Sequence, residues 1–179
     1  MDSSINFTRY FLDAVSYGDE KAMRFFIKKG ADIKGVKDGG TTGLMLAAEK
    51  GHLGIVKIFL NEYSVNVDQK DKKRGNTALI YAIRRSGSTP VPCTKKLLEK
   101  YIKIIELLLD YGADVNVKNK YGKTPLMYAC EDEYGLRWHI VDILNNNGAN
   151  LGTKDTWGKK ALDYARENPG IVGIKVSAI

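Results

Sequence analysis

The side chains that could perform catalysis in this 179-residue chain are few and lie far apart in the sequence. A metal site needs His, Cys or carboxylates at short spacing, but His52 is far from His139 and Cys93 is far from Cys130. A cysteine nucleophile also needs a base and an orienting group, and the sequence offers none beside either cysteine. We therefore expect a protein that is not an enzyme and that binds no metal and no cofactor.

One tripeptide, Gly122-Lys123-Thr124, has the residues that end a phosphate-binding loop. That loop also needs a glycine five positions before its second glycine, so that backbone amides can surround a phosphate. Val117 stands at that position. We therefore interpret the tripeptide as a turn followed by a helix cap.

Composition and charge restrict the class of protein further. Lys and Arg number 28 against 21 Asp and Glu, and 44% of the residues are hydrophobic, which is enough for a packed core. No apolar run approaches the ~20 residues that cross a bilayer, and the N-terminus lacks the pattern of a secretory signal. Two cysteines are too few for a disulfide scaffold. We expect one domain over residues 1–179, no membrane association, and a cytoplasmic location with the nucleus as the alternative.

Two blocks of sequence recur along the chain, which is typical of a repeat protein. The first block begins at Thr42, Thr77, Thr124 and Lys160. A glycine precedes each of these positions by two residues, at Gly40, Gly75, Gly122 and Gly158. The second block is the Gly-Ala-Asp or Gly-Ala-Asn tripeptide that begins at Gly30, Gly112 and Gly148. The spacings fit a unit of about 33 residues with insertions.

Each unit predicts the same local structure. A threonine such as Thr124 caps a short helix, and Pro125 suits the first helical turn. The small pair Ala47-Ala48 allows neighbouring helices to approach closely. A second helix follows and ends at a glycine such as Gly112 in the left-handed conformation. Because such a unit cannot bury its apolar face alone, we expect the units to stack.

These blocks resemble the ankyrin-repeat family over about residues 6–170. The resemblance implies an all-α repeat solenoid of about five repeats, each with a β-hairpin or turn and two antiparallel helices. Their expected ranges are about 6–38, 39–71, 72–118, 119–155 and 156–179. The last range is a partial repeat and forms an atypical C-terminal cap.

Two segments depart from the repeat pattern. The third unit contains an insertion at 88–101, which is either the early start of its second helix or a projecting element that binds a partner. Residues 170–179 end the chain in apolar, β-branched residues, whereas capping repeats normally present a polar outer face. We expect this tail to pack back irregularly, to be frayed, or to contact a partner or the rest of a longer chain.

The concave face of a solenoid is its usual binding surface, and residues that differ between similar units mark the contacts. Residues 72–118 contain ten Lys and Arg but four acids, so the excess charge of the chain is concentrated there. We therefore predict another protein with an acidic segment as the partner, and the simpler alternative is a solvated, lysine-rich surface. The predicted partner-binding residues are Arg74, Arg84, Arg85, Tyr121, Lys123 and Trp157.

Two further functions remain as alternatives. Within the family, the chain resembles ankyrin arms of the ribonuclease L type, which implies a sensor of 2′,5′-linked oligoadenylate. That resemblance gives Asp13 the role of a carboxylate contact, Lys37 that of a basic contact, and Phe7, beside Thr8, that of a stacking aromatic. The other alternative is nucleic-acid binding through the positive field, but no recognition motif accompanies the charge.

Overall fold

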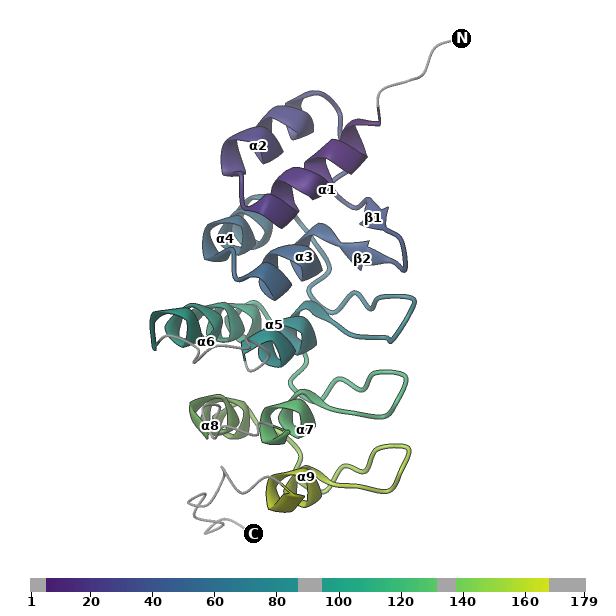
Figure 1. Ribbon diagram of the computed structural model, residues 1–179, viewed down its shortest axis with the longest axis vertical. Coiled ribbons are helices and arrows are strands. Elements are labelled where there is room, and N and C mark those ends of the chain that lie inside the picture. The colour runs from purple at the N-terminus through teal and green to yellow at the C-terminus, as the bar shows by residue number, and fades with distance from the viewer. Residues whose placement is uncertain (1–5, 87–94, 132–137, 168–179) are drawn as a thin grey trace.

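The computed structural model describes residues 6–86, 95–131 and 138–167. Figure 1 shows pairs of helices stacked in one column, with hairpin segments projecting to one side of it. The first helices of the five units are α1 (Phe7–Tyr17), α3 (Gly43–Lys50), α5 (Ala78–Ser86), α7 (Pro125–Cys130) and α9 (Ala161–Glu167). The described second helices are α2 (Glu20–Lys28), α4 (Leu53–Glu62), α6 (Lys95–Asp110) and α8 (Trp138–Asn146). This arrangement confirms the predicted helical repeat solenoid.

Threonine caps begin two of the first helices, as the sequence predicts. Oγ1 of Thr42 accepts a hydrogen bond from the backbone N–H of Met45 at 3.2 Å, and Oγ1 of Thr124 accepts one from Met127 at 3.4 Å. The equivalent Thr77 is different, because its buried hydroxyl has no hydrogen-bond partner among the described residues. Thr77 therefore occupies the cap position without forming the side-chain cap.

The second helices end in two ways. Gly112 follows α6 with a φ of 82°, which is the left-handed conformation expected for the Gly-Ala-Asp block. The second unit lacks this block, and α4 ends instead at Tyr63 in an extended conformation with a φ of −129°. The missing glycine thus changes the exit of the chain without preventing the stack from continuing.

A strand pair forms in one described hairpin, although a hairpin or turn was expected in every unit. β1 (Val36–Lys37) pairs antiparallel with β2 (Thr41–Thr42), with Val36 opposite Thr42. In the next three units the position of Lys37 holds Asp71, Asn119 and Asp155. Each of these side chains accepts hydrogen bonds from two backbone N–H groups of its own loop. These loops are therefore turns organised by a side chain rather than short ladders.

The core lies between the stacked helices. Ala47 and Ala48 are completely buried, so α3 packs closely between its neighbours, and Phe11 meets Phe59 edge to face at 6.1 Å between ring centres. Tyr101, on the long helix α6, is buried and donates its hydroxyl to the carbonyl oxygen of Glu49 at 2.9 Å. The core therefore continues from one unit to the next.

The insertion at 88–101 divides at the start of α6. Residues 95–101 belong to this helix, which confirms the early start of a second helix for that part of the insertion. Its other residues, and the tail at 170–179, lie outside the described residues. In the described part of the chain, no helix has the length and apolar character needed to span a membrane.

Candidate functional site

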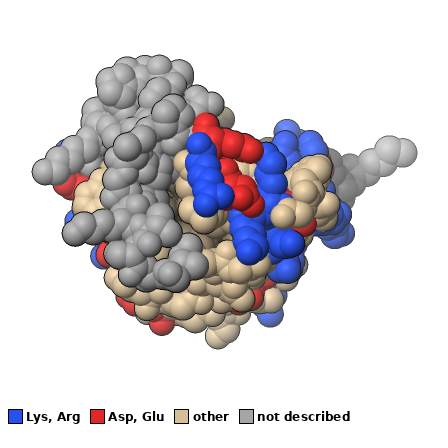
Figure 2. Space-filling view, turned by 90° about the horizontal axis from the view of Figure 1, so that it is seen from below, with Lys and Arg blue, Asp and Glu red and all other residues tan. Residues whose placement is uncertain are grey.

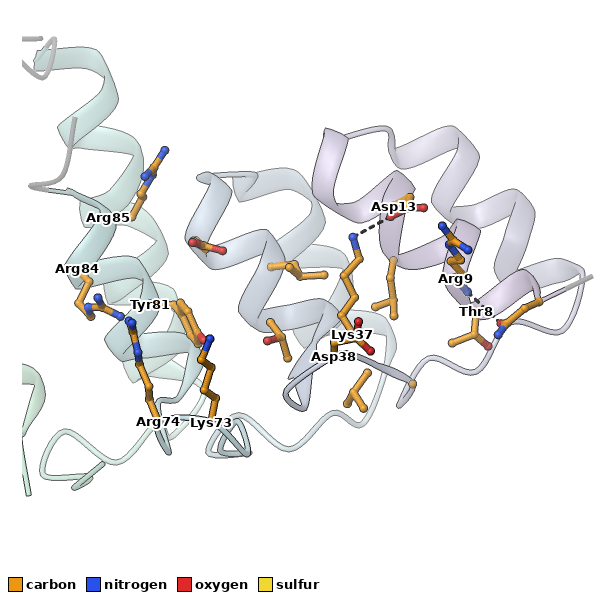
Figure 3. Close-up of a pocket in the computed structure, with 17 residues that line it drawn as sticks. Thr8, Arg9, Asp13, Lys37, Asp38, Lys73, Arg74, Tyr81, Arg84 and Arg85 are labelled. Carbon is orange, nitrogen blue, oxygen red and sulfur yellow. Dashed lines mark hydrogen bonds and ion pairs between the residues drawn. The ribbon is translucent and has the colours of Figure 1, made fainter. Parts of the chain in front are cut away.

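An open groove of about 1200 Å³ runs along the first three units, between their first helices and their hairpin segments. Leu12, Leu46 and Tyr81 line it from α1, α3 and α5, and Val36 and Arg74 line it from the hairpins. Figure 3 shows side chains from all three units around this space. The groove is thus formed by the hairpin segments and the first helices.

Charged side chains dominate the lining of the groove. The cationic ones are Arg9, Lys37, Lys73, Arg74, Arg84 and Arg85. The acidic ones are Asp13, Asp38 and Glu49. Three of the six predicted partner-binding residues, the arginines, therefore share one groove that has a surplus of positive charge.

Arg74 and Arg84 reach the groove from different elements and point toward one another (Figure 3). Arg74 is exposed in the hairpin segment, and Arg84 lies in the last turn of α5. Their charges also act on one phenol: burial raises the pKa of Tyr128, and the hydrogen bond from Asn119 and the charges of Arg84 and Arg74 oppose that rise. Arg85 follows on the same helix but points away from the pair (Figure 3). The side chains of Arg74 and Arg84 thus approach the same part of the groove (Figure 3).

Asp71 holds the hairpin segment that carries Arg74. Asp71 is 3% exposed, and its carboxylate accepts hydrogen bonds from the backbone N–H groups of Arg74, at 2.6 Å, and Asn76, at 2.8 Å. The hydroxyl of Tyr81 donates to the same carboxylate at 3.4 Å, and burial, followed by the charge of Asp71, raises the pKa of Tyr81. These bonds fix the position of the hairpin segment relative to α5.

The N-terminal end of the groove contains the residues expected from the nucleotide-binding alternative. Lys37 and Asp13 do meet, with 2.7 Å between Nζ and Oδ1, so each neutralises the other. Phe7 does not line the groove, because its ring packs against that of Phe26 with 6.5 Å between centres. Thr8 lines the groove instead, and its Oγ1 accepts a hydrogen bond from the backbone N–H of Asp32 at 2.9 Å. The expected stacking aromatic is therefore absent from the groove lining.

An aromatic surface continues the site towards the fourth and fifth units. Tyr121 and Trp157 stack with 5.9 Å between ring centres, and they are 41% and 63% exposed. The Nζ atom of Lys123 lies 5.6 Å from the centre of the Trp157 ring. Arg84 lies 5.4 Å from the ring centre of Tyr128, on the neighbouring helix α7. Arg84 therefore connects the charged groove with the surface that holds the other three predicted residues.

Ion pairs neutralise part of that second surface. Lys123 pairs with Glu131, and its side chain is only 15% exposed. Lys159 makes the equivalent pair with Glu167 at 2.7 Å in the next unit. The charge of Lys123, one of the predicted partner-binding residues, is thus balanced within its own unit.

The third unit has different residues at both positions of this ion pair. Asn76 stands where Lys123 and Lys159 stand, and Arg84 stands where Glu131 and Glu167 stand. At this point of the stack the third unit thus has an asparagine and a groove-lining arginine where the next two units have an ion pair. Its loop is also longer, because Asp71 precedes its glycine by four positions, whereas Asn119 and Asp155 do so by three.

The described residues offer little to support covalent or metal chemistry. Burial, with a smaller contribution from Glu131, raises the pKa of the Cys130 thiol to about 12. Nε2 of His52 lies 3.1 Å from the carbonyl oxygen of Ser16, which ties α3 to α1 through its following turn. In the part of the chain that the structure describes, no group of three His, Cys, Asp or Glu could hold a metal ion. Cys93 lies outside the described residues.

Arg9 and Tyr81 are among the groove residues that sequence analysis missed. Arg9 was missed because the first unit lacks the threonine-led block, so its first helix could not be aligned with the others. Tyr81 was missed because tyrosine recurs at the same position in Tyr128 and Tyr164, and only residues that differ between units were selected. A search for residues that recur on the inner side of the first helices would have found Tyr81.

Figure 2 shows the molecule from its C-terminal end. Figure 2 shows that Lys and Arg gather on the right, the side of the hairpin segments in Figure 1, with acidic side chains between them. This distribution agrees with the pairing of Lys159 with Glu167 at that end of the stack.

A family model described as ankyrin repeats (three copies) matches residues 11–104 and 97–174 of this chain. The chain belongs to the ankyrin-repeat family. Ankyrin repeats bind other proteins, so the chain contains a protein-interaction domain. The family assignment also explains why the first helices and hairpins are lined by variable polar residues, since that face of a solenoid is its binding surface.

Several proteins are similar to this chain over part of their length. The ankyrin repeat protein YahD of Escherichia coli is 33% identical over 121 residues, which cover 68% of this chain and 55% of that protein. The ankyrin repeat, SAM and basic leucine zipper domain-containing protein 1 of Colobus guereza is 31% identical over 122 residues, 68% of this chain and 23% of that protein. The chain thus spans about half of the first relative and about a quarter of the second.

Proposed function

We propose that this ankyrin-repeat chain is a non-catalytic interaction module whose groove binds an acidic segment of a partner protein. The observation that carries the proposal is the convergence of Arg74 and Arg84 in a groove with six cationic and three acidic side chains. Arginine pairs with carboxylates through a planar fork of donors and often contributes strongly to protein interfaces. An acidic segment would balance the surplus charge and would be attracted to the groove from a distance.

The hairpin segments are held in place before any partner binds. The backbone N–H of Lys72 donates to Gly39 O at 2.7 Å, that of Lys120 to Arg74 O at 2.9 Å, and that of Thr156 to Tyr121 O at 3.0 Å. Each bond joins one hairpin segment to the next. A rigid surface loses little conformational entropy on binding, which favours affinity.

The stacked pair of Tyr121 and Trp157 supplies a second contact region in this proposal. Both rings are exposed, and large aromatic side chains contribute strongly to interfaces because they bury much area with few rotatable bonds. The carbonyl oxygen of Tyr121 also accepts a hydrogen bond from the backbone N–H of Thr156. The segment that carries Tyr121 therefore belongs to the same series of hydrogen-bonded hairpin segments as Arg74. A partner segment that contacts Arg74 and Arg84 can continue onto the exposed rings of Tyr121 and Trp157.

The absence of catalysis is also part of the proposal. The one described cysteine, Cys130, is buried with a raised pKa, and the groove contains no cysteine or histidine. Asp71, the carboxylate beside the arginine pair, is already engaged by three donors. These residues support binding by charge and shape, with no nucleophile and base placed together.

A fluorescence anisotropy titration with a labelled glutamate-rich peptide tests the proposal, with a glutamine-rich peptide of the same length for comparison. We expect the glutamate peptide to bind and the Arg84→Glu/Arg85→Glu variant to lose at least about tenfold in affinity, since close like charges cost several kcal/mol. Lys100→Glu/Lys103→Glu, at two exposed positions of α6, is the matched control for charge and should bind normally. Equal binding of the two peptides, or undiminished binding by the double variant, would contradict the proposal.

A further inference from the structure

The first unit carries a cluster of four aromatic rings on α1 and α2, which lie at one end of the stacked column (Figure 1). The ring centre of Phe26 lies 5.3 Å from that of Phe25 and 5.6 Å from that of Tyr10. Phe7 completes the cluster, with 6.5 Å between its ring centre and that of Phe26. Tyr10 and Phe25 are 51% and 53% exposed, so the cluster presents apolar area at the surface of the described part of the chain.

The position of Phe26 is fully buried in the units that follow. The equivalent residues, which likewise stand four positions before the turn that follows the second helix, are Phe59, Leu108 and Leu144. All three are completely buried. Phe59 shows what covers this position, because its ring meets that of Phe11 in the preceding unit at 6.1 Å. Phe26 is only partly buried, so the first unit presents a surface that an inner unit buries against a helix.

Tyr10 makes this surface larger than the inner ones. The first helices of the other units have compact residues at its position, namely Gly43, Ala78, Pro125 and Ala161. A Cβ on Gly43 would lie 2.5 Å from Cζ of Phe59, so that ring rests directly on the glycine. In the first unit the ring of Tyr10 stacks on Phe26 instead, at an angle of 22° between the planes. A terminal repeat normally has a polar outer face, and this unit has exposed rings there.

Cationic side chains accompany the exposed rings. Lys21, Lys28 and Lys29 are exposed and stand four positions before, three after and four after Phe25. Residues at these spacings are neighbours on a helix surface. The Nζ atom of Lys29 lies 5.7 Å from the centre of the Phe25 ring, and Arg9 is exposed next to Tyr10 on α1. The apolar cluster therefore has a positively charged rim.

The acidic residues of the same unit are directed elsewhere or engaged. The carboxylate of Glu20 lies against α4, where a Cβ on Gly54 would collide with its Oε1. Asp19 and Asp32 each accept a hydrogen bond from a backbone N–H of their own segment at 2.9 Å. A partner that covers the rings is therefore favoured when it brings acidic residues to the rim.

We propose that this aromatic end of the stack binds an amphipathic helix of a partner protein whose apolar stripe is flanked by acidic residues. The inner junctions pack helix on helix, as α3 does between α1 and α5, and a surface built like these junctions suits a helix. Apolar residues at i, i+3, i+4 and i+7 of that helix would cover the rings, and glutamates beside them would meet Lys28 and Lys29. The surface is distinct from the groove, whose lining includes neither Tyr10 nor Phe25.

The test uses a labelled, stapled helical peptide with leucines along one stripe and glutamates on both sides of it, titrated by fluorescence anisotropy against the full chain. We expect Tyr10→Ser/Phe25→Ser to weaken binding at least about tenfold, as for aromatic residues at the centre of an interface. Tyr17→Ser, at an exposed position of α1 outside the ring cluster, is the matched control and should bind normally. Lys28→Glu/Lys29→Glu should weaken binding of this peptide and strengthen binding of the same peptide with lysines in place of its glutamates.

Further measurements separate this surface from other occupants and sites. Trp157→Ser should bind the stapled peptide normally, and a loss confined to this variant would place the peptide at the other end of the stack. Equal binding of a peptide of shuffled sequence would contradict recognition of an apolar stripe. Sedimentation velocity should show a monomer, whereas a dimer that Phe25→Ser dissociates would make a second copy the occupant. Tighter binding after deletion of residues 2–5 would make that segment the occupant, and circular dichroism checks that each variant is folded.

Discussion

The Nζ atom of Lys159 lies 2.7 Å from Oε1 of Glu167, and the equivalent residues of the fourth unit, Lys123 and Glu131, also form a pair. These pairs bridge the start and the end of a first helix and cancel charge on the inner side of the stack. The third unit breaks this pattern with Arg84. The third unit therefore has an arginine at the position where the fourth and fifth units have the acid of an ion pair.

Glu131→Gln tests this compensation. The change releases the charge of Lys123 beside the groove, so we expect the glutamate-rich peptide to bind about two- to threefold more tightly at low salt. The partly exposed ion pair should contribute at most about 1 kcal/mol to the free energy of unfolding. Anisotropy titrations and urea denaturation measure the two effects. Glu167→Gln, one unit farther from Arg84, is the matched control and should change the affinity less.

Two threonines at equivalent positions should differ in their contribution to stability. Thr124 caps α7, so Thr124→Ala should lower the free energy of unfolding by about 1 kcal/mol. The buried hydroxyl of Thr77 has no partner among the described residues, so Thr77→Val, which keeps the shape, should be neutral or stabilising. Urea denaturation of both variants measures the contrast. A large loss for Thr77→Val would show that its hydroxyl is hydrogen-bonded in solution.

The sequence predicted the positions of the helices and turns better than it predicted which charged side chains pair with one another. The recurring glycines and threonines act locally, so their spacing was enough to place the helices and the turns. The ion pair of Lys123 with Glu131 was missed because it joins a loop to the end of a helix, and such a contact depends on how the loop folds back. The strand pair formed by Lys37 depends likewise on the absence of the Asp or Asn that organises the other loops.

The arginines of the third unit were selected from the sequence because they differ from the residues at the same positions of other units. Arg84 and Arg85 interrupt an otherwise regular pattern, so they could be identified without a structure. Phe7 was assigned by resemblance alone and lies against Phe26, because an aromatic residue at the start of α1 packs on the second helix of its own unit. Positions in repeat sequences are predicted best where several copies can be compared.

Gly122 and Gly158 have the same place in successive loops but different surroundings. Both have a positive φ, of 71° and 77°. A Cβ on Gly122 would lie 3.0 Å from Cα of Asp155, whereas a Cβ on Gly158 would meet nothing within 4 Å. Gly158→Ala should therefore cost about 1 kcal/mol for its backbone conformation alone, and Gly122→Ala should cost clearly more. Equal midpoints in urea for the two variants would contradict this contact between the hairpin segments.

Cys130 should be unreactive in the folded protein. Its side chain is 4% exposed, and burial raises the pKa of its thiol to about 12, so the reactive thiolate is scarce at pH 8. In a Cys93→Ser background, a disulfide reagent that reports thiols by absorbance should react with Cys130 only after urea is added. Rapid reaction of the folded variant would indicate that the packing of α7 opens readily.

Asp155 should make the stability of the fifth unit depend on pH. Burial alone would raise the pKa of Asp155, but hydrogen bonds from the Tyr164 hydroxyl and from the backbone N–H groups of Lys159 and Trp157 hold it below its ordinary value. Because the folded pKa is lower than the unfolded one, the carboxylate stabilises the fold above the unfolded pKa. This contribution is lost as the pH falls below about 4 and through the folded pKa.

Substitution at Asp155 separates this charge from its hydrogen bonds. Asn119 has the same place in the fourth unit, where its Oδ1 accepts two backbone bonds and its Nδ2 donates to the Tyr128 hydroxyl at 2.9 Å. Asp155→Asn can copy this arrangement, so we expect a loss below about 1 kcal/mol at neutral pH, against about 2 to 3 kcal/mol for Asp155→Ala. Urea denaturation between about pH 6 and pH 3 should show the wild-type protein approaching the Asn variant as the carboxylate is protonated. A constant difference between these two proteins over that range would mean that Asp155 titrates alike in the folded and unfolded chains.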